Sequence, residues 1–396
     1  MKKQIKIPLV AIILAFILII AVVVLLIVNG SKKPDEEEVT NNVSTQNIIR
    51  EEVLNEQIEE TTSISVVPTM KDRLTTDSAW CGTFQLVWND LKNEIAGQDI
   101  KFAEDMEEVN NLNLGEFNTD MISEEYYYKK YGLKTLELKE EIENGIYEKF
   151  GQTSDILDSF DWSEDALNGT DGNLNRYFLY SMLYRKFEFN TKFDKLENGN
   201  FGDKYQNVQY FGINSNTDNN VRDQVQVLYY NSEDDFAIIV NTKSGDNLVL
   251  CKNPEGNSFN DILNNMRNKS SNYTGSKEFN NIDELKIPYI SFDITKEYEE
   301  LENRPFETIR DGERKVARIQ KAIQSIKFSI DENGGEIKSE AGMDIVETTA
   351  MVEPQIETPR YFNFDDTFAM FLVEEDKEMP YFAARIEDIS KYQTLN

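Results

Sequence analysis

The sequence predicts an α+β fold that is preceded by one membrane-spanning helix. Three observations support this: helical periodicity comes early, strand-like runs follow it, and a long apolar stretch stands near the N-terminus. The chain accordingly divides into a short basic tail (residues 1–6), an apolar helix (7–28), a polar acidic linker (29–70) and a folded domain (71–396).

The apolar stretch has the length and composition of a transmembrane helix. Its 22 residues carry no charge and no hydrogen-bonding side chain. As a helix it is about 33 Å long, which is enough to cross the hydrocarbon of a bilayer. A cleavable signal peptide is the alternative, but its apolar core is usually only about 7–15 residues long and no A-x-A site follows here. We therefore expect an uncleaved signal anchor.

Charges on the two sides of this helix predict its orientation. Lys2, Lys3 and Lys6 precede it, whereas only Lys32 and Lys33 follow it. Because the more positive flank stays in the cytoplasm, we expect a cytoplasmic N-terminus and an extracytoplasmic domain. The expected location is the cell membrane, with a single pass through the lipid bilayer at residues 7–28.

Composition excludes several functional classes. The chain has 72 acidic and 41 basic residues, and this net charge of −31 disfavours nucleic acid as a partner. It has no histidine, which excludes histidine-containing triads, HExxH zinc sites and imidazole catalysis by this chain alone. Cys81 and Cys251 are too few for a Cys₄ metal site; they either pair or are two unrelated buried thiols. We expect no enzyme, no metal and no cofactor.

Two helices are predicted in the first part of the domain. The folded region is expected to begin near Thr76. Ser78 is the expected N-cap of the first helix, and Gly97 is its expected end. Apolar residues recur along this helix at a spacing of three or four: Phe84, Val87, Leu91 and Ile95. The second helix has a similar stripe of Leu138, Ile142, Ile146 and Phe150.

Strand patterns dominate the remainder of the domain. Residues 176–184 form an almost continuous apolar and aromatic run, which predicts a central strand buried on both faces. Residues 287–294 alternate as a half-buried strand does. Two β-hairpins are expected, at 225–230 with 236–240 and at 368–373 with 380–386.

The C-terminal two-thirds of the chain resembles the serpin family in an ordered series of segments. Residues 362–372 resemble the C-terminal signature around "(Asn/Asp)-x-Pro-Phe-x-Phe", and residues 323–334 resemble the "HKAxxxVDExG" strand that leads into the serpin reactive loop. Four further segments match in the family's order: residues 181–194, 226–240, 285–294 and 380–386. Each match is weak alone, but six in order are hard to obtain by chance.

The resemblance implies a divergent, bacterial-type, serpin-like domain with N-terminal helices, a large mixed or antiparallel sheet and C-terminal β-hairpins. The N-terminal "FSPLSI" block of serpins has no counterpart, so some helices and a strand of the main sheet are expected to be shortened or missing. The family's shutter histidine falls on Gln324, its shutter asparagine on Ser181 and its breach tryptophan on Phe189. These replacements put the usual control of sheet opening in doubt.

Residues after the 323–334 segment alternate in character with a period of two. One face carries the small or apolar residues Gly335, Ile337, Ser339, Ala341, Met343 and Ile345. The other face carries Glu336, Lys338, Glu340, Gly342 and Asp344. The segment can therefore be a strand in a sheet with one covered face, either as a permanent strand or as half of a hairpin.

By resemblance, this segment is a reactive loop that inserts into the sheet after cleavage. Its hinge comprises Gly334, Gly335, Glu336, Ile337, Lys338, Ser339, Glu340 and Ala341. Ile337, Lys338 and Glu340 are bulkier than an inhibitory hinge prefers. The family's spacing puts the scissile bond near Thr348 and Thr349, with Ala350 and Met351 close by.

Two functions follow as hypotheses. The first is a membrane-tethered inhibitor, expected as a monomer, of an extracellular serine or cysteine protease. No basic residue lies between Lys338 and Arg360, so a preference for small or apolar residues fits better than a trypsin-like target, unless Arg360 is the site. The alternative is a non-inhibitory serpin-fold module for binding or structure at the cell surface.

Overall fold

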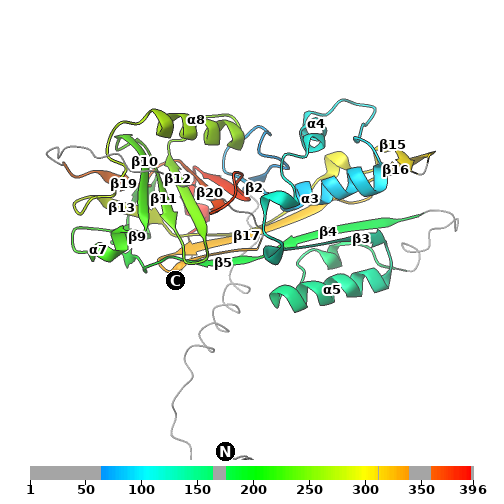
Figure 1. Ribbon diagram of the computed structural model, residues 1–396, viewed down its shortest axis with the longest axis horizontal. Helices are drawn as coiled ribbons and strands as arrows, with labels where there is room; N and C mark the ends of the chain where they lie inside the picture. Colours follow the sequence, from blue (N-terminus) through cyan, green and yellow to red (C-terminus); the bar gives the residue numbers. More distant parts are fainter. Residues whose placement is uncertain (1–63, 164–174, 311, 339–357, 394–396) are drawn as a thin grey trace, which may run out of the picture. The chain divides into compact units, whose positions relative to one another are not determined.

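The computed structural model describes residues 64–163, 175–310, 312–338 and 358–393 (Figure 1). The predicted basic tail, apolar helix and most of the linker lie outside these residues, as does segment 339–357. Within the described residues, no helix is both long and apolar enough to cross a membrane. The membrane anchor and its orientation therefore stay predictions.

A seven-stranded sheet forms the centre of the domain, and α8 (Phe259–Asn272) packs against it (Figure 1). Ser258 caps α8, because its side chain accepts a hydrogen bond from the Asp261 amide. The strands lie in the order β1 (Ser65–Val66), β2 (Ser78–Cys81), β21 (Phe382–Ile386), β20 (Phe368–Glu374), β12 (Asp246–Lys252), β11 (Asp235–Asn241) and β10 (Val225–Ser232). The pairs β10–β11 and β20–β21 are antiparallel, which confirms both predicted hairpins.

A four-stranded sheet stands beside it, in the order β19 (Tyr361–Asn363), β13 (Glu284–Pro288), β9 (Tyr210–Ile213) and β6 (Asp194–Lys195). Gly212 of β9 has φ 155°, and a Cβ there would lie 1.9 Å from the Leu285 carbonyl oxygen. This close approach of β9 to β13 requires glycine. A short pair, β7 (Gly199–Phe201) and β8 (Tyr205–Val208), follows β6.

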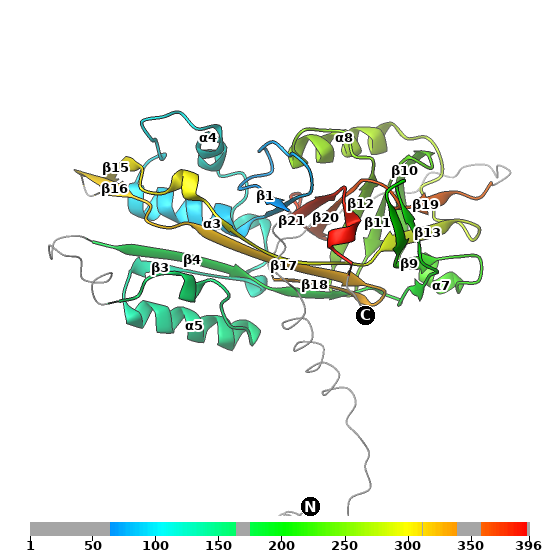
Figure 2. The same cartoon turned by 180° about the vertical axis from the view of Figure 1, so that it is seen from behind.

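The third sheet carries the segment that resembles a reactive loop. Its order is β14 (Ile290–Glu297), β17 (Ile323–Asp331), β18 (Gly334–Lys338) and β5 (Arg185–Glu188), and all its pairs are antiparallel. β4 (Tyr177–Leu183) leads into β5 through Tyr184 and pairs with β3 (Tyr127–Leu133). In Figure 2, β4 and β17 extend together past the end of β18.

Helices pack on the two faces of β4. On one face lie α3 (Thr83–Asp90) and its π-helical continuation η1 (Leu91–Ala96); on the other lies α5 (Leu136–Phe150) (Figure 1). Thr135 caps α5 by accepting a hydrogen bond from the Leu138 amide. The remaining elements are α4 (Glu107–Leu114), α7 (Asn219–Arg222), β15 (Pro305–Arg310), β16 (Glu313–Arg318), and the 3₁₀ helices η2 (Thr119–Met121), η3 (Glu124–Tyr126), η4 (Leu157–Ser159), η5 (Glu299–Leu301) and η6 (Ile389–Lys391).

Both predicted helices exist, but the first begins later than expected. It ends at Gly97, which has φ 68° as predicted for a C-terminal glycine. The assignment of Ser78 as its N-cap is wrong. Ser78 lies in β2, whose backbone pairs with β21, and the helix starts after Gly82 without a side-chain cap. Pairing with a strand 300 residues away thus overrides a local capping signal.

Two strand predictions are corrected. The strand expected over residues 287–294 is two strands in different sheets, β13 and β14, with Tyr289 between them. The strand at 176–184 exists as β4, but it pairs only with β3 among the described strands and its side chains alternate between buried and half-buried. It is therefore not central in its sheet.

The packed domain starts before the predicted boundary at residue 70. Ile64, Val66, Val67 and Met70 are buried in the main core. The Ser65 amide donates a hydrogen bond to the Asp77 carbonyl, and β1 runs parallel to β2. The end of the predicted linker is consequently part of the seven-stranded sheet.

The two cysteines are buried thiols and do not form a disulfide. Cys81 lies in β2 and Cys251 in β12, with β21 and β20 between these strands. Three strand spacings amount to about 14 Å, which is beyond the reach of a disulfide. The alternative of two unrelated thiols therefore holds.

A buried ion cluster joins the third sheet to the seven-stranded sheet. Arg185 Nε lies 2.6 Å from Asp246 Oδ2, and Arg185 Nη1 lies 3.1 Å from Glu374 Oε1. The Arg185 and Asp246 side chains are 2% and 0% exposed. Burial raises the pKa of Asp246 from 3.8 to about 6, against the opposing effect of Arg185, and the Glu374 charge adds to the rise. One guanidinium thus serves two carboxylates.

Removing the guanidinium should destabilise the domain strongly. In Arg185→Met, two buried carboxylates lose their cation, so we expect the free energy of unfolding to fall by about 3–5 kcal/mol. Denaturant-induced unfolding measures this. Lys186→Met, which removes the exposed neighbouring cation, is the control and should change stability by less than about 0.5 kcal/mol. Equal effects of both variants would contradict the role of the cluster.

The same cluster predicts a pH dependence. Because the folded-state pKa of Asp246 is raised to about 6, its contribution to stability is present below about pH 4 and is lost as the pH rises through 6. Between about pH 4.5 and about pH 7.5, the free energy of unfolding of the wild type should fall by about 1–3 kcal/mol relative to that of Asp246→Asn. Glu233→Gln, at an exposed position, should follow the wild type. Parallel curves for wild type and Asp246→Asn would disprove the assignment.

Candidate functional site: a cavity beyond the end of β18

The described part of the predicted hinge is a strand between two others. β18 pairs with β17 on one side and β5 on the other, so that Ile337 lies opposite Phe328 and Arg185. Ile337 is fully buried. The strand character predicted from the alternating pattern is therefore confirmed for residues 335–338.

Two glycines allow β18 to enter this position. Gly334 has φ 151°, and a Cβ on it would lie 2.1 Å from the Phe187 carbonyl oxygen. A Cβ on Gly335 would lie 2.5 Å from the Phe187 ring and 2.6 Å from the Ser329 carbonyl oxygen. Any larger residue would push β18 away from its neighbours.

The other end of β18 is held by an ion pair. Lys338 Nζ lies 2.8 Å from Asp155 Oδ2 and donates a hydrogen bond to the Thr153 carbonyl oxygen at 2.9 Å. Asp155 follows α5, and Lys327 of β17 lies 3.7 Å from it. This pair fixes the last described residue of β18 to the segment behind α5.

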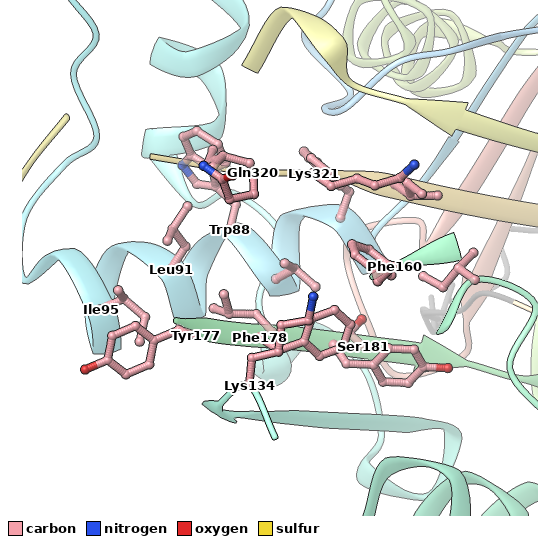
Figure 3. Close-up of a pocket in the computed structure, with 18 of the residues that line it drawn as sticks. Trp88, Leu91, Ile95, Lys134, Phe160, Tyr177, Phe178, Ser181, Gln320 and Lys321 are labelled. Atoms are coloured by element: carbon pink, nitrogen blue, oxygen red, sulfur yellow. The ribbon is translucent and has the colours of Figure 1, made fainter. Parts of the chain in front are cut away.

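A cavity of about 1060 Å³ lies beyond Lys338, between β4 and β17. This sheet cavity is lined by α3 and η1, by β4, by residues 315–325 and by residues 154–161. Figure 3 shows Trp88, Leu91 and Ile95 on one side and Tyr177, Phe178 and Ser181 on the other. Among the described residues no strand fills the space between β4 and β17 there.

Gln324 and Ser181, predicted at the shutter positions, meet at the first residue of α3. Gln324 Nε2 donates hydrogen bonds to the Cys81 carbonyl oxygen at 3.1 Å and to Thr83 Oγ1 at 3.0 Å. Its Oε1 accepts one from the Tyr298 hydroxyl at 2.7 Å. Ser181 Oγ donates to the Thr83 carbonyl oxygen at 3.2 Å. Thr83, which lines the cavity, thus links β4 to β17.

Phe189, at the predicted breach position, lies away from this pair. It is buried among Phe187, Phe193 and Phe211, and its amide donates a hydrogen bond to the Asn333 carbonyl oxygen. It therefore supports the turn between β17 and β18. Ser339, Glu340 and Ala341 of the hinge, and the candidate scissile residues Thr348, Thr349, Ala350 and Met351, lie outside the described residues.

Sequence reasoning missed two features of this region. The Arg185 cluster joins Arg185 to Asp246, 61 positions later, and to Glu374, 189 positions later. No local pattern in the sequence marks such distant contacts. The basic lining of the cavity had a visible signal, because residues 310–327 carry six basic residues against two acidic ones in an acidic chain. Among the described residues, no group of three histidine, cysteine or carboxylate side chains is arranged to hold a metal ion.

Comparison with known proteins yields only distant similarity. No protein-family model matches the chain. No curated protein matches it in sequence. Among solved structures, it is similar to Serpin48, a highly specific serpin of the insect Tenebrio molitor, with a TM-score of 0.36 and 14% identity over 81% of this chain and 75% of that one. It is also similar to thyroxine-binding globulin in complex with thyroxine, with a TM-score of 0.35 and 12% identity over 67% of this chain and 76% of that one.

At such TM-scores, these similarities carry no argument about what this chain binds or does. The serpin-like character of the fold rests on the ordered segments of the sequence and on the arrangement in which β18 lies between β17 and β5. The resemblance implied that the segment after β17 inserts into the sheet after cleavage, whereas residues 334–338 already lie in the sheet of the uncleaved chain.

Removal of the Gln324 amide tests the link beneath the cavity. Gln324→Met should lower the free energy of unfolding by about 2–4 kcal/mol, because the Tyr298 hydroxyl, the Cys81 carbonyl and the Thr83 hydroxyl each lose a buried hydrogen bond to Gln324. Gln320→Met, at an exposed position four residues earlier, is the matched control and should change stability by less than about 0.5 kcal/mol. Thermal and denaturant unfolding provide the comparison. A neutral Gln324→Met would show that the link is dispensable.

Proposed function

We propose that this chain inhibits an extracellular protease by cleavage of residues 339–357 and insertion of their N-terminal part into the sheet cavity. The observation that supports this most strongly is the position of β18. It lies between β17 and β5 and ends where the sheet cavity begins. A strand that continued β18 would enter this cavity directly.

The existing register predicts where each inserted residue would lie. Lys338 is opposite Lys327, and Ile337 is opposite Arg185. Because both pairings are antiparallel, each step forward along the inserted strand would move its partners one residue back along the chain toward the beginning of β17 and of β4. Residues on the face of Ile337 would lie as follows: Ser339 between Leu183 and Ile326, Ala341 between Ser181 and Gln324, Met343 between Leu179 and Ala322, and Ile345 between Tyr177 and Gln320.

The chemistry of these positions suits the residues that would occupy them. Ala341 is small, as the space beside the Thr83 hydrogen bonds requires. Met343 and Ile345 would lie over the apolar side chains of α3 and η1 that line the cavity. Burying each of these two side chains contributes about 1.5–3 kcal/mol, and a new strand also pairs the open backbone groups of β4 and β17.

Both ends of the proposed loop are anchored, which favours insertion only after cleavage. Lys338 is held by Asp155 at the N-terminal end. At the C-terminal end, Arg360 Nη2 lies 2.6 Å from Asp283 Oδ2, and β19 pairs with β13 directly after it. A cut near Thr348 and Thr349 would free the N-terminal part to move without breaking the β19 pairing.

The target of the proposed inhibitor is a serine or cysteine protease that prefers small or apolar residues. Segment 339–357 has no basic residue. Arg360, the next basic residue, is 12% exposed and engages Asp283, so its side chain is not available to a trypsin-like pocket. In this proposal the apolar helix at residues 7–28 tethers the domain to the outer side of the cell membrane.

A non-inhibitory module for binding or structure is the second candidate. Ile337 is already fully buried, and Lys338 is paired, before any cleavage. A permanent strand has these features too. The difference between the two functions is whether cleavage moves residues 339–345 into the cavity.

Two variants with the same new side chain at adjacent positions test insertion. The full-length chain is nicked in residues 345–357 with an elastase-like protease, and its thermal unfolding is compared before and after. Insertion should raise the melting temperature by about 10 °C or more. Ala341→Lys should abolish the rise, because a charge would be buried beside Gln324, whereas Glu340→Lys replaces one charge by another and should keep it.

Inhibition itself is tested by incubation with subtilisin- and elastase-like proteases, followed by denaturing gels. A covalent complex with at least one protease is expected for the wild type and for Glu340→Lys but not for Ala341→Lys. Insertion without any covalent complex would favour the non-inhibitory module. No rise in melting temperature on nicking would refute the insertion mechanism itself.

A further inference from the structure

The wall of the sheet cavity is basic although the chain is strongly acidic. Its lining includes eight basic and two acidic residues, in a chain of net charge −31. The basic residues are Lys134, Arg176, Arg310, Lys315, Arg318, Lys321, Lys327 and Lys338; the acidic ones are Asp155 and Asp161. A cavity with a positively charged lining concentrates anions.

Four of these cations are not neutralised by a carboxylate. Lys134 Nζ donates to the Asp161 carbonyl oxygen at 2.6 Å, Arg310 Nη1 to the Tyr177 hydroxyl at 3.5 Å, and Arg318 Nη1 to the Asn303 carbonyl oxygen at 2.7 Å. Across the described residues, no ion pair within 4.0 Å joins these three or Arg176 to a carboxylate. An anionic ligand would therefore not have to displace an existing ion pair.

Three of the four cations come from Lys134 and Arg176, which lie beside the beginning of β4, and from Arg310, which contacts its first residue. The Lys134 amide donates to the Arg176 carbonyl oxygen at 2.8 Å, and Arg310 reaches the hydroxyl of the next residue, Tyr177. Burial lowers the pKa of Lys134; Asp161 opposes this effect and Arg176 adds to it. The cationic end of the cavity is therefore the end at which β4 begins.

The rest of the cavity offers an apolar surface. α3 and η1 contribute Phe84, Val87, Trp88, Leu91 and Ile95 to its lining, and Figure 3 labels Trp88, Leu91 and Ile95 on these helices. The seven residues of β4 span about 23 Å. One acyl chain is about 15 Å long, half the hydrocarbon thickness of a bilayer, and so fits along this strand.

We propose that the sheet cavity binds an elongated apolar carboxylate, such as a long-chain fatty acid. The carboxylate lies near Lys134, Arg176 and Arg310, and the chain lies over α3 and η1. The ligand occupies the space proposed for residues 339–345, so binding and insertion exclude each other. Binding to the intact chain does not require insertion, and the two proposals can fail separately.

Quenching of Trp88 fluorescence reports this binding locally. The full-length chain, in nanodiscs of uncharged lipid, is titrated with ω-bromoundecanoate, whose bromine quenches tryptophan on contact. The chain has three tryptophans, and only Trp88 lines the cavity. A saturable quench is expected for the wild type and should be absent in Trp88→Phe, which removes the reporter. The uncharged ω-bromoundecanol is the matched control ligand and should quench much more weakly.

Charge variants test the cationic end. Arg310→Gln, at an exposed position, and Arg176→Gln, at a half-buried one, should each raise the dissociation constant about threefold. Arg314→Gln, on the same hairpin but outside the lining, should leave it unchanged. Equal quenching by acid and alcohol, a saturable quench that persists in Trp88→Phe, or equal effects of the three arginine variants would each overturn the proposal. After insertion has been established by the rise in melting temperature, the nicked chain should lose the saturable quench.

Discussion

The Arg185 guanidinium determines where β5 lies, and the third sheet depends on that position. Its partners Asp246 and Glu374 belong to β12 and β20 of the seven-stranded sheet, so the ion cluster holds β5 against the centre of the domain. β18 then has a fixed edge to pair with. β4, which precedes β5 and is separated from it only by Tyr184, pairs with a different strand, β3, and the sheet cavity begins at this change of partner.

The cavity persists because its two walls are stabilised from outside. β4 packs on α5 and pairs with β3, while β17 pairs with β14. Thr83 links the walls from below through Ser181 and Gln324, which sets their separation without closing it. The proposed insertion and the proposed ligand both use the space that these contacts leave between β4 and β17.

Local patterns in the sequence predicted local structure well. Both hairpins, the stripes of α3 and α5, and the strand character of residues 335–338 depend on periodicity within about ten residues, which a single sequence displays. Features that failed depend on distant partners. Ser78 joins β2 because β21 lies beside it, and the run 287–294 divides because its halves pair with β9 and β17. The Arg185 cluster and the depth to which β18 enters the sheet also arise from contacts that no periodicity encodes.

The two proposed occupants of the cavity share one pattern of chemistry. Segment 339–357 has five acidic residues and no basic one, and its alternation places Glu340 and Asp344 on the face opposite Met343 and Ile345. A fatty acid likewise presents one apolar part and one anionic part. Since the cavity combines an apolar floor with cations that lack carboxylate partners, either occupant removes apolar surface from water and neutralises charge at once. A neutral or basic strand would gain only the first of these, so in the proposed insertion the acidity of segment 339–357 would add to its affinity for the cavity.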